Sequence, residues 1–259
     1  MWCVCRPHRW SQTVIDRLRA KSWDESLGQP PDSIHLPQHL FDVVKCSVAI
    51  LAATRDSQLR AFGLDPTVVG DRFAKIVVIA AACHDLGKAN SHFQPLVHAS
   101  ARPDAQRIKQ AVRHEWISWF LLQQSEMQSW IKSHLLGSYA ELDWHILLWA
   151  ITGHHPAFGR EIPTEQSNGS NDKIEIYRSH PDYRECLDLV AKTLDEPNCP
   201  FQLESQVYSV ETDILASIRD SLSTSMLLRQ TWRRDPATTA PCLGLSSRSY
   251  RNWMVSQFS

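Results

Sequence analysis

Apolar side chains recur every three to four residues along much of this chain, which is the spacing of a helix with one buried face. In the first clear case, Leu40, Val43, Val44 and Leu51 share one stripe. The same spacing predicts helices over residues 36–54, 71–84, 104–124, 141–151, 181–194 and 203–229. No stretch alternates convincingly with period two, and no internal repeat is present. The pattern therefore predicts an all-α fold, a helical bundle.

Breaks in this pattern divide the chain into three predicted parts. Residues 1–34 contain Pro7, Gly28, Pro30 and Pro31, which interrupt any long helix, so we expect an irregular lead-in. Residues 35–230 hold the long helices and form one predicted domain, with polar loops expected at 89–102 and 158–179. Residues 231–259 are rich in Thr, Pro, Gly and Ser, and we expect them to form a loosely ordered tail.

Composition excludes several classes of protein. The 259 residues are 43% hydrophobic and 21% charged, which is ordinary for a soluble globular domain with a real core. A formal net charge of −1 argues against tight stand-alone binding of nucleic acid, but not against a nuclease that receives its strand from a partner. No apolar run looks long enough to span a membrane. The seven cysteines follow no disulfide framework, so we expect a reducing, cytoplasmic setting.

The 12 histidines change the picture, because histidine is the commonest ligand of transition metals. His84 and Asp85 follow an apolar helical stretch that Gly87 stops. They present an imidazole and a carboxylate at one helix end, where a divalent metal can be held by both groups. An exposed pair of this kind would mean little. This pair ends a predicted buried helix, which favours a metal site.

Further histidines lie at comparable places in other predicted helices. His39 is on the inner stripe of the first helix, and His114 is on a stripe of the 104–124 helix. His154 and His155 follow Gly153 at the end of another helix. Consecutive imidazoles point about 100° apart on a helix, so both reach one metal only where the helix end is distorted. Each of these histidines alone would be read as structural, and the series makes the metal interpretation stronger.

These residues form a candidate ligand set of His39, His84, Asp85, His114, His154, His155 and Asp213. One structural metal takes four ligands, so the set fits two metals with open positions. A carboxylate such as Asp85 can bridge two cations about 3.5–4 Å apart, as two-metal phosphodiester enzymes require. Imidazole with carboxylate favours Mn, Fe, Co or Ni, with Zn and Mg as further candidates. The predicted chemistry is hydrolytic, with activated water attacking phosphorus in line and Asp85 and Lys88 as catalytic residues. Lys88 reads equally well as an ordinary lysine at a helix C-terminus.

Four short motifs carry a resemblance to a known family. They are His39-Leu40-Phe41-Asp42-Val43, His84-Asp85-Leu86-Gly87-Lys88 with Phe93-Gln94 following, His114-Glu115, and Thr152-Gly153-His154-His155. Their order and spacing over residues 35–160 resemble the HD-superfamily nuclease domain of CRISPR-associated type I effectors. The family's late aspartate lies in an Ala-Asp-Trp-like stretch. Here the closest match contains Asp213 and lacks the tryptophan.

The resemblance implies a metal-dependent nuclease that cuts single-stranded DNA in antiviral interference. It implies a first metal on His39, His84, Asp85 and Asp213, and a second on Asp85, His114, His154 and His155. The implied partners are a separate or fused helicase subunit and a CRISPR RNA-guided surveillance complex. The chain has no helicase phosphate-binding loop, so we expect a separate nuclease subunit or a fragment of a longer protein.

Two other functions fit the same residues. An HD-type phosphohydrolase acting on nucleotides would use the same ligands, but it needs a closed pocket that reads a base. A non-catalytic HD remnant would keep the fold and bind no metal. Metal content and a choice of substrates separate these alternatives from the nuclease.

Overall fold

Seven α-helices, with a further α-helical segment at 216–223, make up most of the structure over residues 15–99, 110–135, 139–154 and 173–223, the part of the chain that the computed structural model describes. They are α1 (Leu36–Ala61), α2 (Pro66–Cys83), α3 (Phe93–Ala99), α4 (His114–Leu122), α5 (Ser125–Ser133), α6 (Ala140–Gly153) and α7 (Pro181–Thr193). Three 3₁₀ turns are also described, at Glu25–Leu27, Asp32–Ile34 and Leu86–Lys88. The predicted all-α fold is confirmed.

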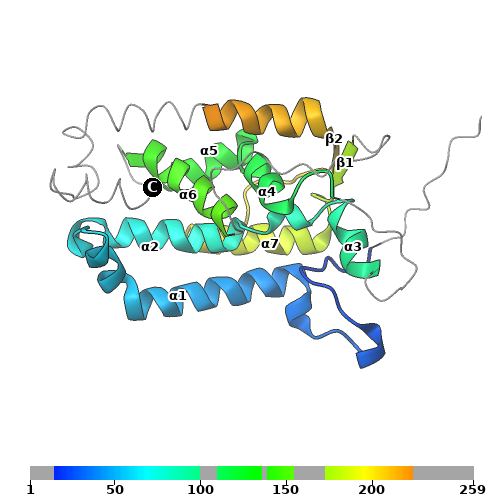
Figure 1. Cartoon of the computed structure of the whole chain (residues 1–259), viewed down its shortest axis with the longest axis horizontal. Helices are drawn as coiled ribbons and strands as arrows, with labels where there is room; N and C mark the ends of the chain where they lie inside the picture. The colour runs from blue at the N-terminus through cyan, green and yellow to red at the C-terminus, as the bar shows by residue number, and fades with distance from the viewer. Residues whose placement is uncertain (1–14, 100–109, 136–138, 155–172, 224–259) are drawn as a thin grey trace, which may run out of the picture.

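The first two helices run side by side in opposite directions, as Figure 1 shows. The reversal falls between Ala61 and Pro66, where the Asp65 carboxylate accepts a hydrogen bond of 2.9 Å from the Thr67 amide. Pro66 occupies the first turn of α2, where its missing N–H costs nothing. The sequence predicted that Asp71 would cap this helix. The structure shows the cap one and a half turns earlier, at Asp65.

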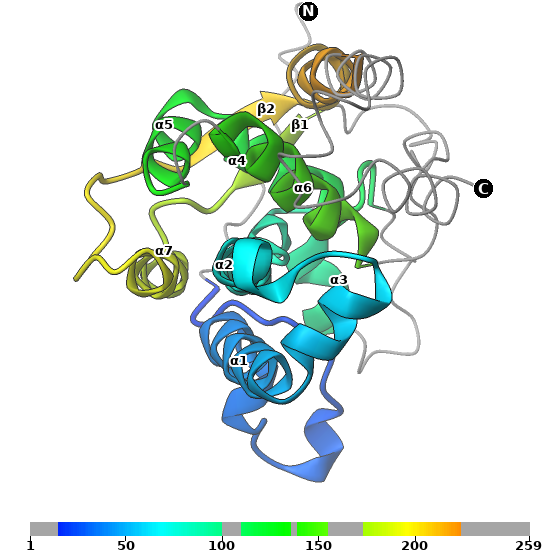
Figure 2. The same ribbon diagram turned by 90° about the vertical axis from the view of Figure 1, so that its left-hand side faces the viewer.

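Helix α2 occupies the centre of the molecule and contacts α1, α6 and α7 (Figure 2). Its last two turns are small or apolar, and Ile79, Ala82 and Cys83 are fully buried. Small side chains let the neighbouring helices approach closely on every side. The β-branched run 76–79 is helical, as predicted, because the alanines after it continue the helix.

Two helices differ from their predicted positions. The 104–124 helix begins only at His114 among the described residues, because Arg113 has an extended backbone with φ −67° and ψ 147°. The polar loop expected at 89–102 contains α3. Asn90 starts that helix, since its Oδ1 accepts hydrogen bonds from the amides of His92 (2.8 Å) and Phe93 (2.9 Å).

A short two-stranded antiparallel sheet of β1 (Lys173–Ile176) and β2 (Gln206–Ser209), with α7 between the strands in the chain, was not predicted. It replaces the end of the expected 158–179 loop and the start of the expected 203–229 helix. Ile174 and Ile176 are fully buried on one face of β1. After β2 the chain forms a π-helical segment at Val210–Leu215 and continues as α-helix to the last described residue, 223.

The end of the predicted lead-in packs into the fold as irregular chain. Leu18 is fully buried, and its amide donates to the Asp182 carboxylate of α7 at 2.7 Å. Arg19 pairs with His35 in an isolated antiparallel bridge. Residues 1–14 and the predicted tail at 231–259 lie outside the described residues.

Helix α1 is long and apolar enough to qualify as a membrane span by length and composition alone. The apolar pattern of the sequence had predicted no such span. Its most apolar 18-residue window has a mean hydropathy of 1.3 and is 17% buried. A single such helix is weak evidence for a membrane span. Leu36 and Leu40 of α1 belong to the core, whereas Phe41, Val48 and Ile50 are exposed.

Candidate metal centre

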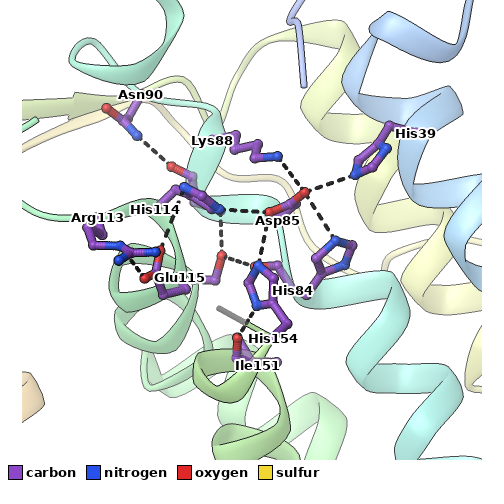
Figure 3. A network of polar contacts seen from close by, with 12 residues as sticks. His39, His84, Asp85, Lys88, Asn90, Arg113, His114, Glu115, Ile151 and His154 are labelled. Carbon is purple, nitrogen blue, oxygen red and sulfur yellow. Dashed lines mark hydrogen bonds and ion pairs between the residues drawn. The ribbon is translucent and has the colours of Figure 1, made fainter. Parts of the chain in front are cut away.

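Four imidazoles from four helices surround one carboxylate, that of Asp85 (Figure 3). The Nε2 atoms of His39 and His84 lie 3.0 and 3.1 Å from its Oδ2. Those of His114 and His154 lie 3.1 and 3.6 Å from its Oδ1. The antiparallel pairing of α1 and α2 explains half of this arrangement, because it brings the start of α1 beside the end of α2. The start of α4 supplies His114, and the end of α6 supplies His154.

The turn after α2 holds Asp85 against α4. Gly87 lies so close to α4 that a Cβ on it would be 2.1 Å from the carbonyl oxygen of His114 and 2.6 Å from the amide of Ser118. The Ser118 hydroxyl accepts a hydrogen bond from the Gly87 amide and donates one to the His84 carbonyl, both at 2.8 Å. The spacing between the His-Asp pair and His114 is therefore set by direct backbone contact.

Backbone carbonyls determine which nitrogen carries the proton in two of the rings. Nδ1 of His84 lies 2.9 Å from the Ala81 carbonyl, and Nδ1 of His154 contacts the Ile151 carbonyl. A carbonyl oxygen only accepts, so Nδ1 carries the hydrogen and Nε2 of the neutral ring is a bare lone pair. That lone pair faces an Asp85 oxygen, which is also an acceptor. Two facing acceptors repel each other unless a proton or a cation lies between them.

The charge of Asp85 favours the cation. Asp85 is 2% exposed, and its Oδ1 has no partner of hydrogen-bond geometry among the described residues. Burial raises the pKa of this carboxyl, and a proton or cation between its oxygens and the imidazoles of His114, His154, His39 and His84 holds it well below its usual range. Burial lowers the pKa of His114, which keeps that ring neutral near pH 7. A buried carboxylate ringed by imidazole nitrogens fits a divalent metal site.

The donor atoms divide into two groups that share Asp85. His39, His84 and Asp85 form one, and Asp85, His114 and His154 form the other, with the ligand atoms of each within 4.8 Å of one another. Each group faces a different oxygen of the shared carboxylate. A carboxylate that offers one oxygen to each of two cations has the geometry of a metal bridge.

Lys88 lies inside the same site. Its Nζ is 2.7 Å from Oδ2 of Asp85 and 5.4 Å from the centre of the Phe93 ring, and the residue is 9% exposed. It therefore points inward, unlike an ordinary solvated lysine at a helix end. Gln94 fixes its backbone, because the fully buried amide donates to the Lys88 carbonyl and pairs with both backbone groups of Arg19.

Five of the seven predicted ligands converge, and the structure does not bring Asp213 to them. Asp213 is exposed, and its Oδ2 accepts a 2.7 Å hydrogen bond from the Ser209 amide. The reason is the two-stranded sheet, because the expected helix gives way to β2 and a π-helical segment, and the Asp213 carboxylate closes the junction between them. His155 lies outside the described residues.

Sequence reasoning missed the residues that support the ligands. Ser118, Glu115 and Asn90 are buried and polar, and each contacts a ligand or the turn that carries Asp85. The sequence marks two of the supporting residues, since Glu115 lies in the His-Glu motif and Gln94 lies in the Phe-Gln motif. Nothing in the helical pattern marks Ser118, whose hydroxyl acquires its role from the contact between two elements.

An all-α fold that gathers a His-Asp pair and further helix-borne histidines around one carboxylate defines an HD domain. The family model described as "Cas3, HD domain" matches residues 20–241, so the chain belongs to the HD-domain family of Cas3, a family of CRISPR-associated nucleases. A "Putative CRISPR-associated nuclease/helicase Cas3" from Myxococcus xanthus (strain DK1622) is 29% identical over 181 residues. That match covers 70% of this chain and 23% of the relative, so the chain spans about a quarter of the relative's length. No solved structure matches.

Proposed function

We propose that this chain is a metal-dependent nuclease domain that hydrolyses phosphodiester bonds of single-stranded DNA in a type I CRISPR interference system. The observation that carries the proposal is the shared carboxylate. Asp85 is buried and offers one oxygen to each of two histidine pairs. Family membership supports the same reading, since the family and the relative are both described by the name Cas3.

In this proposal His39 and His84 would hold one cation and His114 and His154 the other, with the Asp85 carboxylate shared by the two groups. His155, next to His154, is a proposed further ligand. Two divalent ions such as Mn, Fe, Co or Ni, when bound, supply Lewis-acid stabilisation of the phosphate and lower the pKa of water to near neutral. The carbonyls of Ala81 and Ile151 orient the rings of His84 and His154 toward the shared carboxylate.

Lys88 is the proposed phosphate-binding group. In the described structure its ammonium neutralises Oδ2 of Asp85 at 2.7 Å. When metal is held by Asp85, the Lys88 ammonium would be available to contact a phosphate oxygen of the strand. Lys88→Ala should therefore weaken substrate binding more than metal binding.

The net charge of −1 gives the chain little general attraction for a polyanion. We therefore propose that a helicase part, fused or separate, and an RNA-guided complex deliver the strand in the cytoplasm. The relative is described as a nuclease/helicase, and the larger part of its length lies outside the match, which supports a helicase partner. Nuclease and helicase then act on the same displaced strand.

The test combines elemental analysis with cleavage of circular single-stranded DNA in Mn, Ni, Co or Mg. Asp85→Ala should abolish cleavage, because the bridging carboxylate is lost. Asp71→Ala is the matched control, since this carboxylate lies on α2, the helix that precedes Asp85, with its side chain 98% exposed. Full cleavage by Asp85→Ala would overturn the proposal. Hydrolysis of nucleotides without DNA cleavage would establish the phosphohydrolase, and absence of both metal and activity would establish a non-catalytic remnant.

A further inference from the structure

The three rings whose Nε2 atoms face Asp85 from α2, α4 and α6 differ in what their other nitrogen contacts. Nδ1 of His84 and Nδ1 of His154 face backbone carbonyls. Nδ1 of His114 faces a carboxylate oxygen, Oε2 of Glu115, at 3.7 Å (Figure 3). A carbonyl and a carboxylate both accept hydrogen bonds only, but the carboxylate also carries a full negative charge. His114 is thus the ring among these three that lies against an anion on both sides.

The burial of Glu115 needs an explanation. It is 3% exposed, and buried glutamates are uncommon unless they are paired. Arg113 pairs with Oε1, where its Nε lies 2.5 Å away. Oε2 has no hydrogen-bond partner among the described residues, and it is the oxygen that faces His114. The ion pair with Arg113 therefore accounts for one oxygen of this carboxylate and leaves the other unexplained.

A negative charge beside Nδ1 stabilises the form of the ring that carries its proton there. The opposite nitrogen, Nε2, then keeps a lone pair directed at the space beside Oδ1 of Asp85. Metal-binding histidines commonly have such a carboxylate or carbonyl on their second nitrogen, and losing it weakens metal binding by about 10–100-fold.

We propose that Glu115 is a positioning residue that keeps the proton of His114 on Nδ1, so that Nε2 is free to bind metal. This inference rests on the proposed function, because it concerns the same centre. Glu115 touches neither Asp85 nor the substrate in this account. It acts only through His114.

Glu115→Gln gives a sharp test because it preserves the shape of the side chain and replaces one hydrogen-bond acceptor by a donor. Arg113 requires an acceptor, so the amide oxygen of the glutamine stays on the Arg113 side and the NH₂ group faces His114. That NH₂ donates to Nδ1 and favours the tautomer with the proton on Nε2. In the metal-free protein Oδ1 of Asp85, 3.1 Å from Nε2, competes for the same proton. We therefore expect the ¹⁵N chemical shifts of His114 to show both tautomers in the parent and the Nε2-protonated form in Glu115→Gln. Mn²⁺ affinity, measured by isothermal titration calorimetry, should fall by about 10–100-fold.

Glu185→Gln is the matched control, since it removes the same charge from an exposed position on α7. It should leave the His114 tautomer and Mn²⁺ affinity unchanged. If the role of Glu115 is purely structural, Glu115→Gln should lower the thermal midpoint and leave the His114 tautomer and Mn²⁺ affinity at the parent values. That result would overturn the inference. Failure of the parent itself to bind Mn²⁺ would instead overturn the proposed function, and the tautomer measurement would still decide the role of Glu115.

Discussion

Replacing Gly87 by alanine should separate the two halves of the metal centre. Gly87 lies in the turn that carries Asp85, and this turn rests directly on α4. An added Cβ would be 2.1 Å from the His114 carbonyl oxygen and 2.6 Å from the Ser118 amide nitrogen. Both are backbone atoms of a buried helix, so neither can rotate out of the way.

The geometry sets the size of the effect. Real Cβ contacts are essentially never shorter than 3.0 Å, so the turn and α4 must separate by about 0.9 Å. The 3.1 Å distance between Asp85 Oδ1 and His114 Nε2 would increase with them. A misplacement of about 1 Å at a reacting centre costs about 100-fold in rate. Overpacking of this kind also costs about 1–3 kcal/mol of folding stability.

Gly153→Ala is the control, because a Cβ at Gly153 meets nothing within 4 Å among the residues that the structure describes, although this glycine directly precedes His154. We expect Gly87→Ala to cleave circular single-stranded DNA about 100-fold more slowly at saturating Mn²⁺, and Gly153→Ala to keep the parent rate. Urea unfolding of both variants measures the loss of folding stability separately from the loss of cleavage rate. Parental Mn²⁺ affinity, rate and unfolding midpoint in Gly87→Ala would refute the claim that backbone contact sets the spacing of the centre.

Three further outcomes follow from the same contacts. Ser118→Ala leaves the buried Gly87 amide without its partner and should lower the free energy of unfolding by about 1–3 kcal/mol; an unchanged urea midpoint would contradict this. Removing metal with a chelator should lower the thermal midpoint of the parent, since a ligand at 100 times its Kd adds about 2.7 kcal/mol to the free energy of unfolding. The thermal midpoint of Asp85→Asn should change little when metal is removed. Burial lowers the pKa of His92 and the pKa of His145 below 6.5. Each imidazole therefore binds a proton less readily in the folded state than in the unfolded state. The metal-free protein should therefore be most stable above pH 6.5 and lose stability toward pH 5.5; a higher urea midpoint at pH 5.5 than at pH 7.5 would refute that sign.

The periodic pattern of apolar residues was sufficient to predict the helices that form the core. It predicted α1, α2, α6 and α7, because each has one continuous inner stripe and a local stop or start signal. It also predicted that His84 and Asp85 would end a buried helix. Each of these features depends on neighbours within one or two helical turns, which the sequence displays directly.

The two-stranded sheet and the start of α4 could not be predicted in this way. Lys173 of β1 pairs with Ser209 of β2, far along the chain, and neither strand has enough residues to show a period-two pattern. The start of α4 depends on the extended backbone at Arg113, which the helical periodicity of residues 104–124 does not reveal. Both features result from contacts between distant segments.

The sequence alone determined which residue types could bind metal and which helix faces or ends carry them. Only the tertiary structure decided which of them meet. His39 reaches Asp85 because α1 and α2 are antiparallel, and His114 reaches it because Gly87 permits the turn to rest on α4. Asp213 stays outside because a strand replaces the expected helix before it. Periodicity encodes the direction in which a side chain points from its own helix, whereas the distance between two helices is set by packing across the whole core.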